Sequence, residues 1–198
     1  MMPEQNKFIM QRSFFAGMMI GIGALINTRC TNQFIGAFLF SFGLLTILNM
    51  DGLLYTGRIG YFNLKDDIRY QIGQYIEILL CNMIGVLSIA MLSINTNSQV
   101  FLTKLSHNML HTFTSSILCG IMMYLAVELW RNKKSNLYVI MAIMIFVLGG
   151  FDHCIANMYY WGINPVQACQ PRTILFFIVN ITGNTIGSLL MRYISSNK

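Results

Sequence analysis

The sequence predicts an all-α membrane protein with six transmembrane helices, arranged as two three-helix repeats of opposite orientation. Composition is one reason: 55% of the 198 residues are hydrophobic and only 10% are charged, far more apolar than an average soluble domain. A second reason is that the apolar runs are long enough for roughly 20 residues of helix each. The third is that glycine and aspartate interrupt two of these runs at matching places. Together these features predict an integral membrane protein with broken helices.

The apolar runs follow one another with short polar connections. We expect transmembrane helices at residues 14–28, 34–50, 70–94, 109–130, 137–161 and 174–194. The first run follows Lys7 and Arg12 but continues through Ile26 without a small-residue cleavage site, so it is interpreted as a retained helix rather than a signal peptide. Connections this short leave no room for a soluble domain, and we expect one transmembrane domain across residues 1–198.

The arithmetic of six helices explains the two orientations. Each half contains three helices, and because three is odd the second half enters the membrane upside down relative to the first. The first repeat spans about residues 10–95 and the second about residues 104–194. The second and fifth helices are then the middle helices of their halves, and both are expected to be interrupted.

The basic residues indicate how the protein is oriented. If both termini lie on one side of the bilayer, that side collects ten of the 13 basic residues. These ten are Lys7, Arg12, Arg58, Lys65, Arg69, Arg131, Lys133, Lys134, Arg192 and Lys198; the other three are Arg29, Lys104 and Arg172. The positive-inside rule then predicts a multi-pass protein of the cell membrane with both termini in the cytoplasm. Topology accounts for the net charge of +6, and no basic patch with interleaved aromatic residues indicates nucleic-acid binding.

Ionisable side chains stand where membrane helices should be apolar. The second run ends with Asp51, and the fifth contains Gly149-Gly150-Phe151-Asp152-His153. Ionisable groups at mid-membrane depth are costly and usually mark a transport pathway or proton relay. Broken helices at matching positions free backbone groups that only a cavity tolerates. The breaks therefore predict a substrate site. The alternative is that His153 is structural, bonded to Asp152 or a carbonyl, while both aspartates cap or brace helix starts.

Four motifs resemble those of the formate/nitrite transporter family. Residues 151–158 (Phe-Asp-His-Cys-Ile-Ala-Asn-Met) resemble its fifth-helix signature, and residues 54–57 (Leu-Tyr-Thr-Gly) resemble the loop that interrupts its second helix. Residues 117–119 (Ile-Leu-Cys) with 125–127 (Leu-Ala-Val) resemble its fourth helix, and residues 183–187 resemble its last helix. The resemblance implies an aquaporin-like fold, a homopentamer with one pore per subunit, and passage of small monovalent anions such as formate, nitrite or hydrosulfide.

The resemblance also implies which residues form the site. His153 is the expected pore histidine, Thr56 the hydroxyl of the interrupting loop and Lys104 the cation near the outer vestibule, with Asp152 and Asn157 beside them on the substrate pathway. The apolar constrictions that it implies are Phe40, Leu44 and Phe146 on the cytoplasmic side and Leu54, Tyr55 and Met123 on the outer side.

The chain departs from the family's pattern at several positions, among them Tyr55 and Met123 at the outer constriction. Gly120 stands where an asparagine commonly faces the histidine, so one expected hydrogen-bond partner of His153 is missing. Leu53 stands where the family has a glutamate, while Asp51 appears two residues earlier.

A charge in an apolar constriction is costly, so the pathway needs a device that lowers this cost. A vestibule cation such as Lys104 raises the local anion concentration. Histidine has an ordinary pKa of about 6.5 and can share a proton near neutral pH. We expect anions to enter past Lys104, meet His153 and Thr56 between two constrictions, and pass as the protonated acid or as a hydrogen-bonded anion. Protons are then possible co-substrates.

Two other classes of function remain as alternatives. A neutral-solute channel of the aquaporin type requires paired Asn-Pro-Ala boxes, whereas the sequence has the single Asn164-Pro165-Val166. A membrane enzyme or redox subunit would need histidines to bind haem, and the chain has only three. We therefore expect no enzymatic activity, no cofactor and no bound metal.

Overall fold

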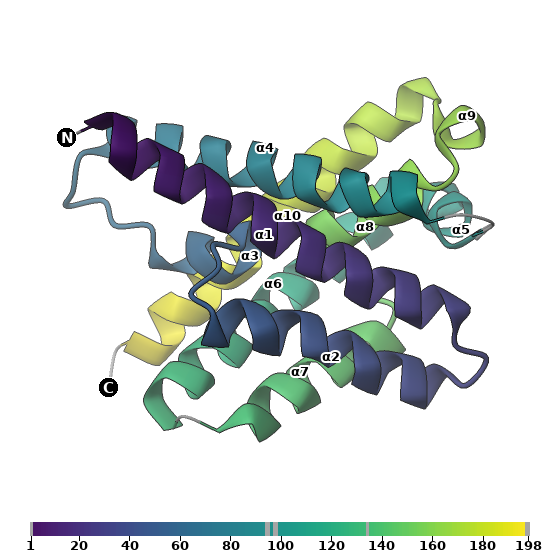
Figure 1. Ribbon diagram of the computed structural model, residues 1–198, viewed down its shortest axis with the longest axis horizontal. Coiled ribbons are helices and arrows are strands. Elements are labelled where there is room, and N and C mark those ends of the chain that lie inside the picture. The colour runs from purple at the N-terminus through teal and green to yellow at the C-terminus, as the bar shows by residue number, and fades with distance from the viewer. Residues whose placement is uncertain (1, 94–95, 97–98, 134, 197–198) are drawn as a thin grey trace.

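The structure is a computed structural model that describes residues 2–93, 96, 99–133 and 135–196. Within these residues every regular element is helical (Figure 1). The elements are α1 (Met2–Arg29), α2 (Gln33–Asn49), α3 (Tyr55–Arg58), the 3-10 helix η1 (Ile59–Tyr61), α4 (Ile68–Leu92), α5 (Val100–Ser106), α6 (Met109–Lys133), α7 (Asn136–Leu148), α8 (Cys154–Gly162), α9 (Pro165–Ala168) and α10 (Pro171–Ser196). Ile94, Lys134 and Lys198, which entered the sequence predictions, lie outside the described residues.

Helix lengths separate two kinds of apolar segment. Among the described residues, α1, α4, α6 and α10 are long and apolar enough to cross a membrane. Helices α2 and α7 are shorter, and each is followed by a non-helical stretch and then by a short helix, α3 or α8. These stretches, residues 50–54 and 149–153, fall where the sequence predicted interruptions. We call them the first break and the second break.

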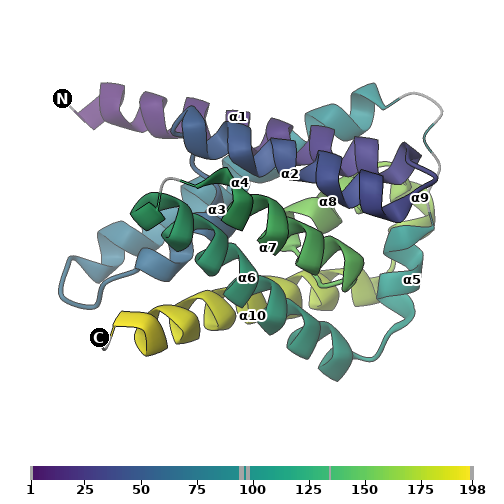
Figure 2. The same cartoon turned by 90° about the horizontal axis from the view of Figure 1, so that it is seen from below.

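The long helices pack in two pairs. Helix α1 lies against α4 and also contacts α2, while α6 lies against α10 and also contacts α7. Helices α2 and α7 pack against each other and join the two groups (Figure 2). Close approach within the pairs depends on glycine: a Cβ placed on Gly17 would clash with the backbone of Asn82 in α4, and one on Gly120 would clash with that of Asn184 in α10.

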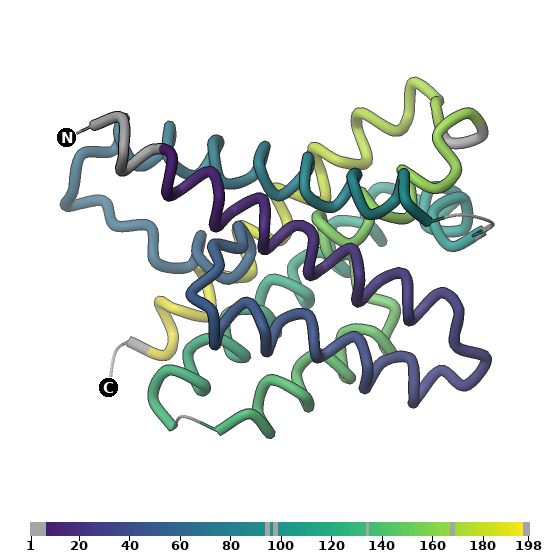
Figure 3. The backbone as a smooth tube through the Cα atoms, viewed as in Figure 1, coloured from purple at the N-terminus to yellow at the C-terminus, as the bar shows by residue number. Residues whose placement is uncertain are grey.

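Each short helix crosses to the other half of the molecule. Helix α3 packs against α6 and α10, while α8 packs against α1 and α4. Both termini lie at one end of the molecule, which we call the terminal end (Figure 3). The α1–α2 connection, α5 and α9 lie at the opposite end, which we call the far end. The crossing brings the two breaks together near the middle.

The outer surface is rich in exposed apolar side chains. On α2, Phe34, Phe38 and Phe42 recur every four residues and are 67%, 51% and 61% exposed. Residues at this spacing share one helix face. Large exposed apolar surfaces are unusual in soluble monomers, so this surface fits contact with lipid or with other membrane-embedded subunits.

Candidate functional site

The two breaks turn the backbone in the same way. Asp51 and Gly150 both have positive φ angles, 53° and 67°, a region that glycine occupies without strain and that aspartate tolerates better than most residues. In the first break the amide of Gly52 donates to the Ile47 carbonyl at 2.7 Å, and in the second the amide of Phe151 donates to the Phe146 carbonyl at 3.0 Å. Both turns end their helix and point the following residues into the protein.

An asparagine from a long helix holds the first break. The backbone amide of Tyr55 donates to Oδ1 of Asn82 at 2.8 Å, and Nδ2 of Asn82 donates to the Leu53 carbonyl at 2.8 Å and to the Ser13 carbonyl at 2.6 Å. Asn82 is fully buried. The clamp therefore satisfies backbone groups on both sides of Leu54.

A second asparagine holds the second break with the same pattern. The backbone amide of Cys154 donates to Oδ1 of Asn184 at 2.9 Å, and Nδ2 of Asn184 donates to the carbonyls of Asp152 and Ser116, both at 2.8 Å. Asn184 is also fully buried. The residue between the clamped groups is now His153, which occupies the place that Leu54 holds in the first break.

His153 is held by hydrogen bonds at both ring nitrogens. It is the N-cap of α8, and its Nδ1 accepts from the backbone amide of Ala156 at 3.1 Å. Because a backbone amide only donates, Nδ1 carries no hydrogen, and the neutral ring carries its hydrogen on Nε2. Nε2 lies 2.8 Å from Oγ1 of Thr56 and donates to it. His153 is 1% exposed and Thr56 is 0% exposed, so this pair joins α3 to the second break in the interior.

The hydroxyl hydrogen of Thr56 is the unused donor of this pair. The Thr56 oxygen accepts from His153, and among the described residues no acceptor lies in hydrogen-bonding position for the hydroxyl hydrogen.

The structural alternative for His153 predicted a bond to Asp152 or to a carbonyl. That prediction is wrong, since its partners are Thr56 and the Ala156 amide.

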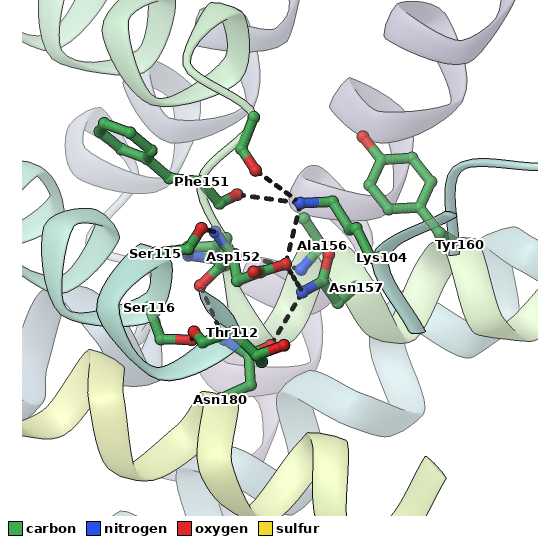
Figure 4. Close-up of polar contacts among 12 residues, drawn as sticks. Lys104, Thr112, Ser115, Ser116, Phe151, Asp152, Ala156, Asn157, Tyr160 and Asn180 are labelled. Carbon is green, nitrogen blue, oxygen red and sulfur yellow. Dashed lines mark hydrogen bonds and ion pairs between the residues drawn. The ribbon is translucent and has the colours of Figure 1, made fainter. Parts of the chain in front are cut away.

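Lys104 is tied to the second break. Its Nζ donates to Oδ1 of Asp152 at 2.9 Å and to the carbonyls of Gly150 at 2.8 Å and Phe151 at 3.3 Å, as Figure 4 shows. These bonds use all three donors of an ammonium group. The side chain of Asp152 is 1% exposed and that of Lys104 is 13% exposed. Lys104 is therefore a buried ion-pair partner rather than a free cation.

Helix α5 sets the position of Lys104. Phe101, one turn earlier on α5, is fully buried. Its ring lies 5.3 Å from that of Phe176 and 5.6 Å from that of Phe177, both on α10. This aromatic contact fixes the short helix against α10.

Asn157 and Asn180 continue the network of Asp152. Nδ2 of Asn157 donates to Oδ1 of Asp152 at 3.0 Å and to Oδ1 of Asn180 at 2.9 Å. Nδ2 of Asn180 donates in turn to the Asp152 carbonyl at 2.7 Å and to Oγ of Ser116 at 2.9 Å. The Asp152 amide donates to Oγ of Ser115 at 3.1 Å. Figure 4 shows Asp152 at the centre of this group.

The aspartates do not cap the short helices as the sequence suggested. The N-caps of α3 and α8 are Leu54 and His153. Asp51 lies at the beginning of the first break and pairs with Arg12 at 3.2 Å. Asp152 braces the second break through Lys104 and Asn157, as its alternative role predicted.

Two cavities approach the breaks from the ends of the molecule. The terminal cavity has a volume of about 340 Å³ and is lined by residues that include Arg12, Arg58 and Leu54. The far cavity has a volume of about 440 Å³ and reaches Lys104 and His153. Among the described residues, none lines both cavities. Leu54 and Gly57, on either side of residues 55 and 56, line the terminal cavity, whereas His153, the partner of Thr56, lines the far cavity.

The residues of the predicted constrictions have different surroundings in the structure. Leu44 and Leu54 line the terminal cavity together. Phe146 lines the far cavity, and Phe40 packs edge-on against it with ring centroids 5.5 Å apart. Phe40 is 1% exposed and lines neither cavity. These contacts do not place the residues relative to the cytoplasm, so the division into a cytoplasmic and an outer constriction stays a prediction.

Tyr55 and Met123 line neither cavity. The Tyr55 hydroxyl lies 2.8 Å from Oγ1 of Thr185 on α10, and its ring packs edge-on against Tyr75 on α4. Met123 is 1% exposed within the core. These contacts give both residues packing roles, and the constriction role that the resemblance implied stays a prediction.

Gly120 does not leave His153 without a partner. A side chain at this position would run into the Asn184 backbone, and Oγ of Ser188 donates to the Gly120 carbonyl at 3.0 Å. Gly120 thus permits the close contact of α6 with α10. The histidine has both ring nitrogens bonded elsewhere, so the expected gap at its ring is absent.

Sequence reasoning missed the clamps and much of the network. Asn82 and Asn180 lie within predicted helices, and their signal was a carboxamide inside an apolar run, where a polar group needs a buried partner. Asn184 was noticed only through its family motif. The serines at 115 and 116 gave no distinct signal, because serine is common in membrane helices.

Comparison with known proteins relates the whole chain to one family. The sequence model described as Formate/nitrite transporter matches residues 4–195. The chain is 25% identical over 200 residues to the formate channel FocA of Haemophilus influenzae, and the match covers 80% of this chain and 69% of that protein.

Two solved structures share the fold. One is described as a pentameric formate channel with formate bound; it has a TM-score of 0.75 and 19% identity, with 98% of this chain and 95% of that chain covered. The other is described as an FNT family ion channel, with a TM-score of 0.78, 17% identity, and 96% and 90% coverage.

Proposed function

The chain belongs to the formate/nitrite transporter family, and from that premise we propose that it conducts small monovalent anions, namely formate, nitrite or hydrosulfide, through a pore between its two breaks. The observation that carries the proposal is the buried bond of 2.8 Å between His153 and Thr56, placed between cavities from opposite ends. A polar pair at the meeting point of two cavities is where a crossing anion needs a donor.

The hydrogen-bond directions support a donor role at this point. His153 donates from Nε2 to Thr56, which leaves the Thr56 hydroxyl hydrogen for an anion. Hydrogen bonds in such a chain polarise one another, and a charged acceptor strengthens the bond that it receives. An anion that leaves the cavity water thus regains part of its lost solvation at Thr56.

Proton sharing has a structural cost in this arrangement. A second hydrogen on His153 would occupy Nδ1, which now accepts the Ala156 amide. Protonation of the ring therefore requires α8 to give up its cap. We propose that protons reach the anion through the His153–Thr56 chain when the cap opens, and that the anion otherwise passes hydrogen-bonded.

We propose for Lys104, which lines the far cavity, a role in addition to the vestibule cation that the resemblance implied. Its charge is offset by Asp152 at 2.9 Å, so it attracts anions less than a free cation would. We propose that Lys104, Asp152 and Asn157 hold the second break rigid at the far cavity. His153 is then presented at a fixed position.

The same proposal includes the architecture that the sequence predicted. We propose one transmembrane domain of six spans in two inverted repeats with an aquaporin-like arrangement, assembled as a homopentamer in the cell membrane with both termini in the cytoplasm. Support comes from the matched clamps of Asn82 and Asn184, from the crossing of α3 and α8, and from the location of both termini at one end. The pentameric formate channel of the same fold supports the assembly.

A neutral-solute channel is the competing function, and a flux assay separates the two. Stopped-flow measurements on proteoliposomes are expected to show fast entry of formate, nitrite or hydrosulfide and no entry of glycerol above that of empty vesicles. Entry of glycerol without any of the three anions would contradict the proposal.

A matched pair of variants tests the donor at Thr56. Thr56→Ser keeps a hydroxyl, whereas Thr56→Val has nearly the same shape without one. We expect Thr56→Val to lower anion flux by about tenfold or more, the range seen when a single positioned donor is removed, and Thr56→Ser to retain most of it. Equal flux through both variants would remove Thr56 from the mechanism.

A further inference from the structure

The terminal cavity is lined by an unusual number of arginines. Arg12, Arg58 and Arg131 all contribute to its wall, together with the single acidic residue Asp51. The far cavity differs, because Lys104 is the only Lys, Arg, Asp or Glu among the described residues of its lining and is bonded to the buried Asp152. The terminal cavity therefore carries excess positive charge, whereas the charge at the far cavity is balanced.

The three guanidinium groups differ in the partners that they already have within the protein. Arg131 stacks on the Tyr61 ring with its guanidinium carbon 4.6 Å from the ring centroid. Arg12 pairs with Asp51 at 3.2 Å, and the two side chains are 30% and 79% exposed. Among the residues that the structure describes, Arg58 has neither a hydrogen-bond nor an ion-pair partner for its side chain.

Among the described residues, the neighbouring carboxylate of Glu128 forms no ion pair with these arginines. Glu128 does not line the cavity, and its two oxygens accept from the Tyr61 hydroxyl at 2.5 Å and from Nδ2 of Asn132 at 2.9 Å. Asp51 is mostly exposed, and ion pairs of this kind contribute little, because water competes with both groups. Arg12 can therefore exchange Asp51 for another anion at small cost.

We propose that the terminal cavity is an anion-binding site in which Arg58 is the primary ligand and Arg12 is a second ligand that is released from Asp51 when the anion enters. A guanidinium presents paired donors that match two oxygens of a carboxylate or nitrite. The site therefore takes small planar oxyanions in preference to spherical ones. This assignment goes beyond the proposed conduction, since equilibrium binding at this cavity does not require an open pore.

A tryptophan in the cavity wall provides the readout. Trp130 lines the terminal cavity, and the chain has only one other tryptophan, Trp161, on α8. The Trp161→Phe variant thus leaves Trp130 as the sole fluorophore. Iodide is an anionic collisional quencher, and acrylamide is a neutral one. Their quenching constants, measured on the purified protein in detergent at constant ionic strength, report anion enrichment and plain accessibility respectively.

Three substitutions in this background test the roles of the charges. Arg58→Gln is expected to lower the iodide quenching constant by about twofold or more, and Asp51→Asn to raise it, because removal of each charge changes the local anion concentration in the opposite direction. Arg69→Gln is the matched control, since Arg69 is exposed on α4 and lines a different depression; it should change little. Formate should protect Trp130 from iodide and leave acrylamide quenching unaltered.

Either of two results would overturn the assignment. One is an equal loss of iodide quenching in Arg58→Gln and Arg69→Gln, which would indicate general surface charge. The other is a parallel change with iodide and acrylamide across the variants, which would indicate altered accessibility of Trp130. Because no transport is measured, this failure is distinct from a failure of anion conduction in liposomes.

Discussion

Around Leu54 and around His153 the backbone is clamped in the same way, by Asn82 in one half and by Asn184 in the other. The residues that the clamps present are different. At the two corresponding positions the first break carries Leu53 and Leu54, whereas the second carries Asp152 and His153. The shared framework therefore fixes geometry, and the side chains decide what each break contributes.

The difference assigns separate tasks to the two breaks. The first supplies an apolar wall at the terminal cavity together with the Thr56 hydroxyl at the start of α3. The second supplies the polar centre and a buried ion pair that holds it. In the proposed mechanism, one half of the chain provides the barrier and the other provides the group that lowers it for an anion.

The buried ion pair at the second break gives the strongest expected effect on stability. Lys104→Met would leave the Asp152 carboxylate buried without its cation, and loss of one partner of a buried pair costs about 3–5 kcal/mol. The free energy of unfolding is measured by circular dichroism during titration of mixed micelles with a denaturing detergent.

A double variant serves as the control. Lys104→Met combined with Asp152→Asn removes both charges, and replacement of both partners costs much less than removal of one. We expect the double variant to be more stable than Lys104→Met alone. A double variant that is less stable would show that the pair contributes through something other than charge compensation.

The two asparagine clamps give the second-largest expected effect on stability. Asn82→Ala and Asn184→Ala each leave buried backbone groups unpaired, and each such group costs about 1–3 kcal/mol. The two variants should lose similar stability in the same unfolding experiment, because their bonds match. Only Asn184→Ala displaces His153, so it should also reduce formate flux more than Asn82→Ala does. Equal flux in the two variants would mean that the clamp does not position the histidine.

The exposed ion pair at the first break has the smallest expected effect. Arg12→Gln leaves Asp51 with most of its surface in water, and exposed pairs contribute about 0–1 kcal/mol. The unfolding free energy should therefore stay within about 1 kcal/mol of the parent. A loss as large as that of Lys104→Met would contradict the distinction between a solvated first break and a buried second one.

The helix ends and one site residue could be predicted from the sequence, because the residues that indicate them lie next to one another in the chain. Glycine and aspartate inside apolar runs predicted where α2 and α7 end, and the family motif identified His153. The contacts of Asn82 and Asn184 were not predictable, because each clamp joins a break to a helix about 30 residues away and depends on how the helices cross. The packing role of Gly120 was not predictable for the same reason: it depends on the spacing of α6 and α10.

The surroundings of Phe40 and Leu44 could not be read from the sequence. Their spacing places them one turn apart on α2, but Leu44 lines the terminal cavity whereas Phe40 packs against Phe146, and this depends on how α2 and α7 pack. The pairing of Lys104 with Asp152 was also hidden, since α5 is fixed by Phe101 against α10 rather than by any nearby motif.

Formate flux across pH in His153→Leu proteoliposomes, beside His153→Asn and Leu54→Met, tests whether the polar centre of the second break carries conduction. His153→Leu copies the first break, Asn retains an N-cap side chain without a titratable ring, and Leu54→Met conserves volume at the other break. We predict that His153→Leu loses about tenfold or more of the flux, that His153→Asn folds normally but loses the pH dependence, and that Leu54→Met resembles the parent. Parental flux and an unchanged pH profile in His153→Leu would contradict this role of the second break.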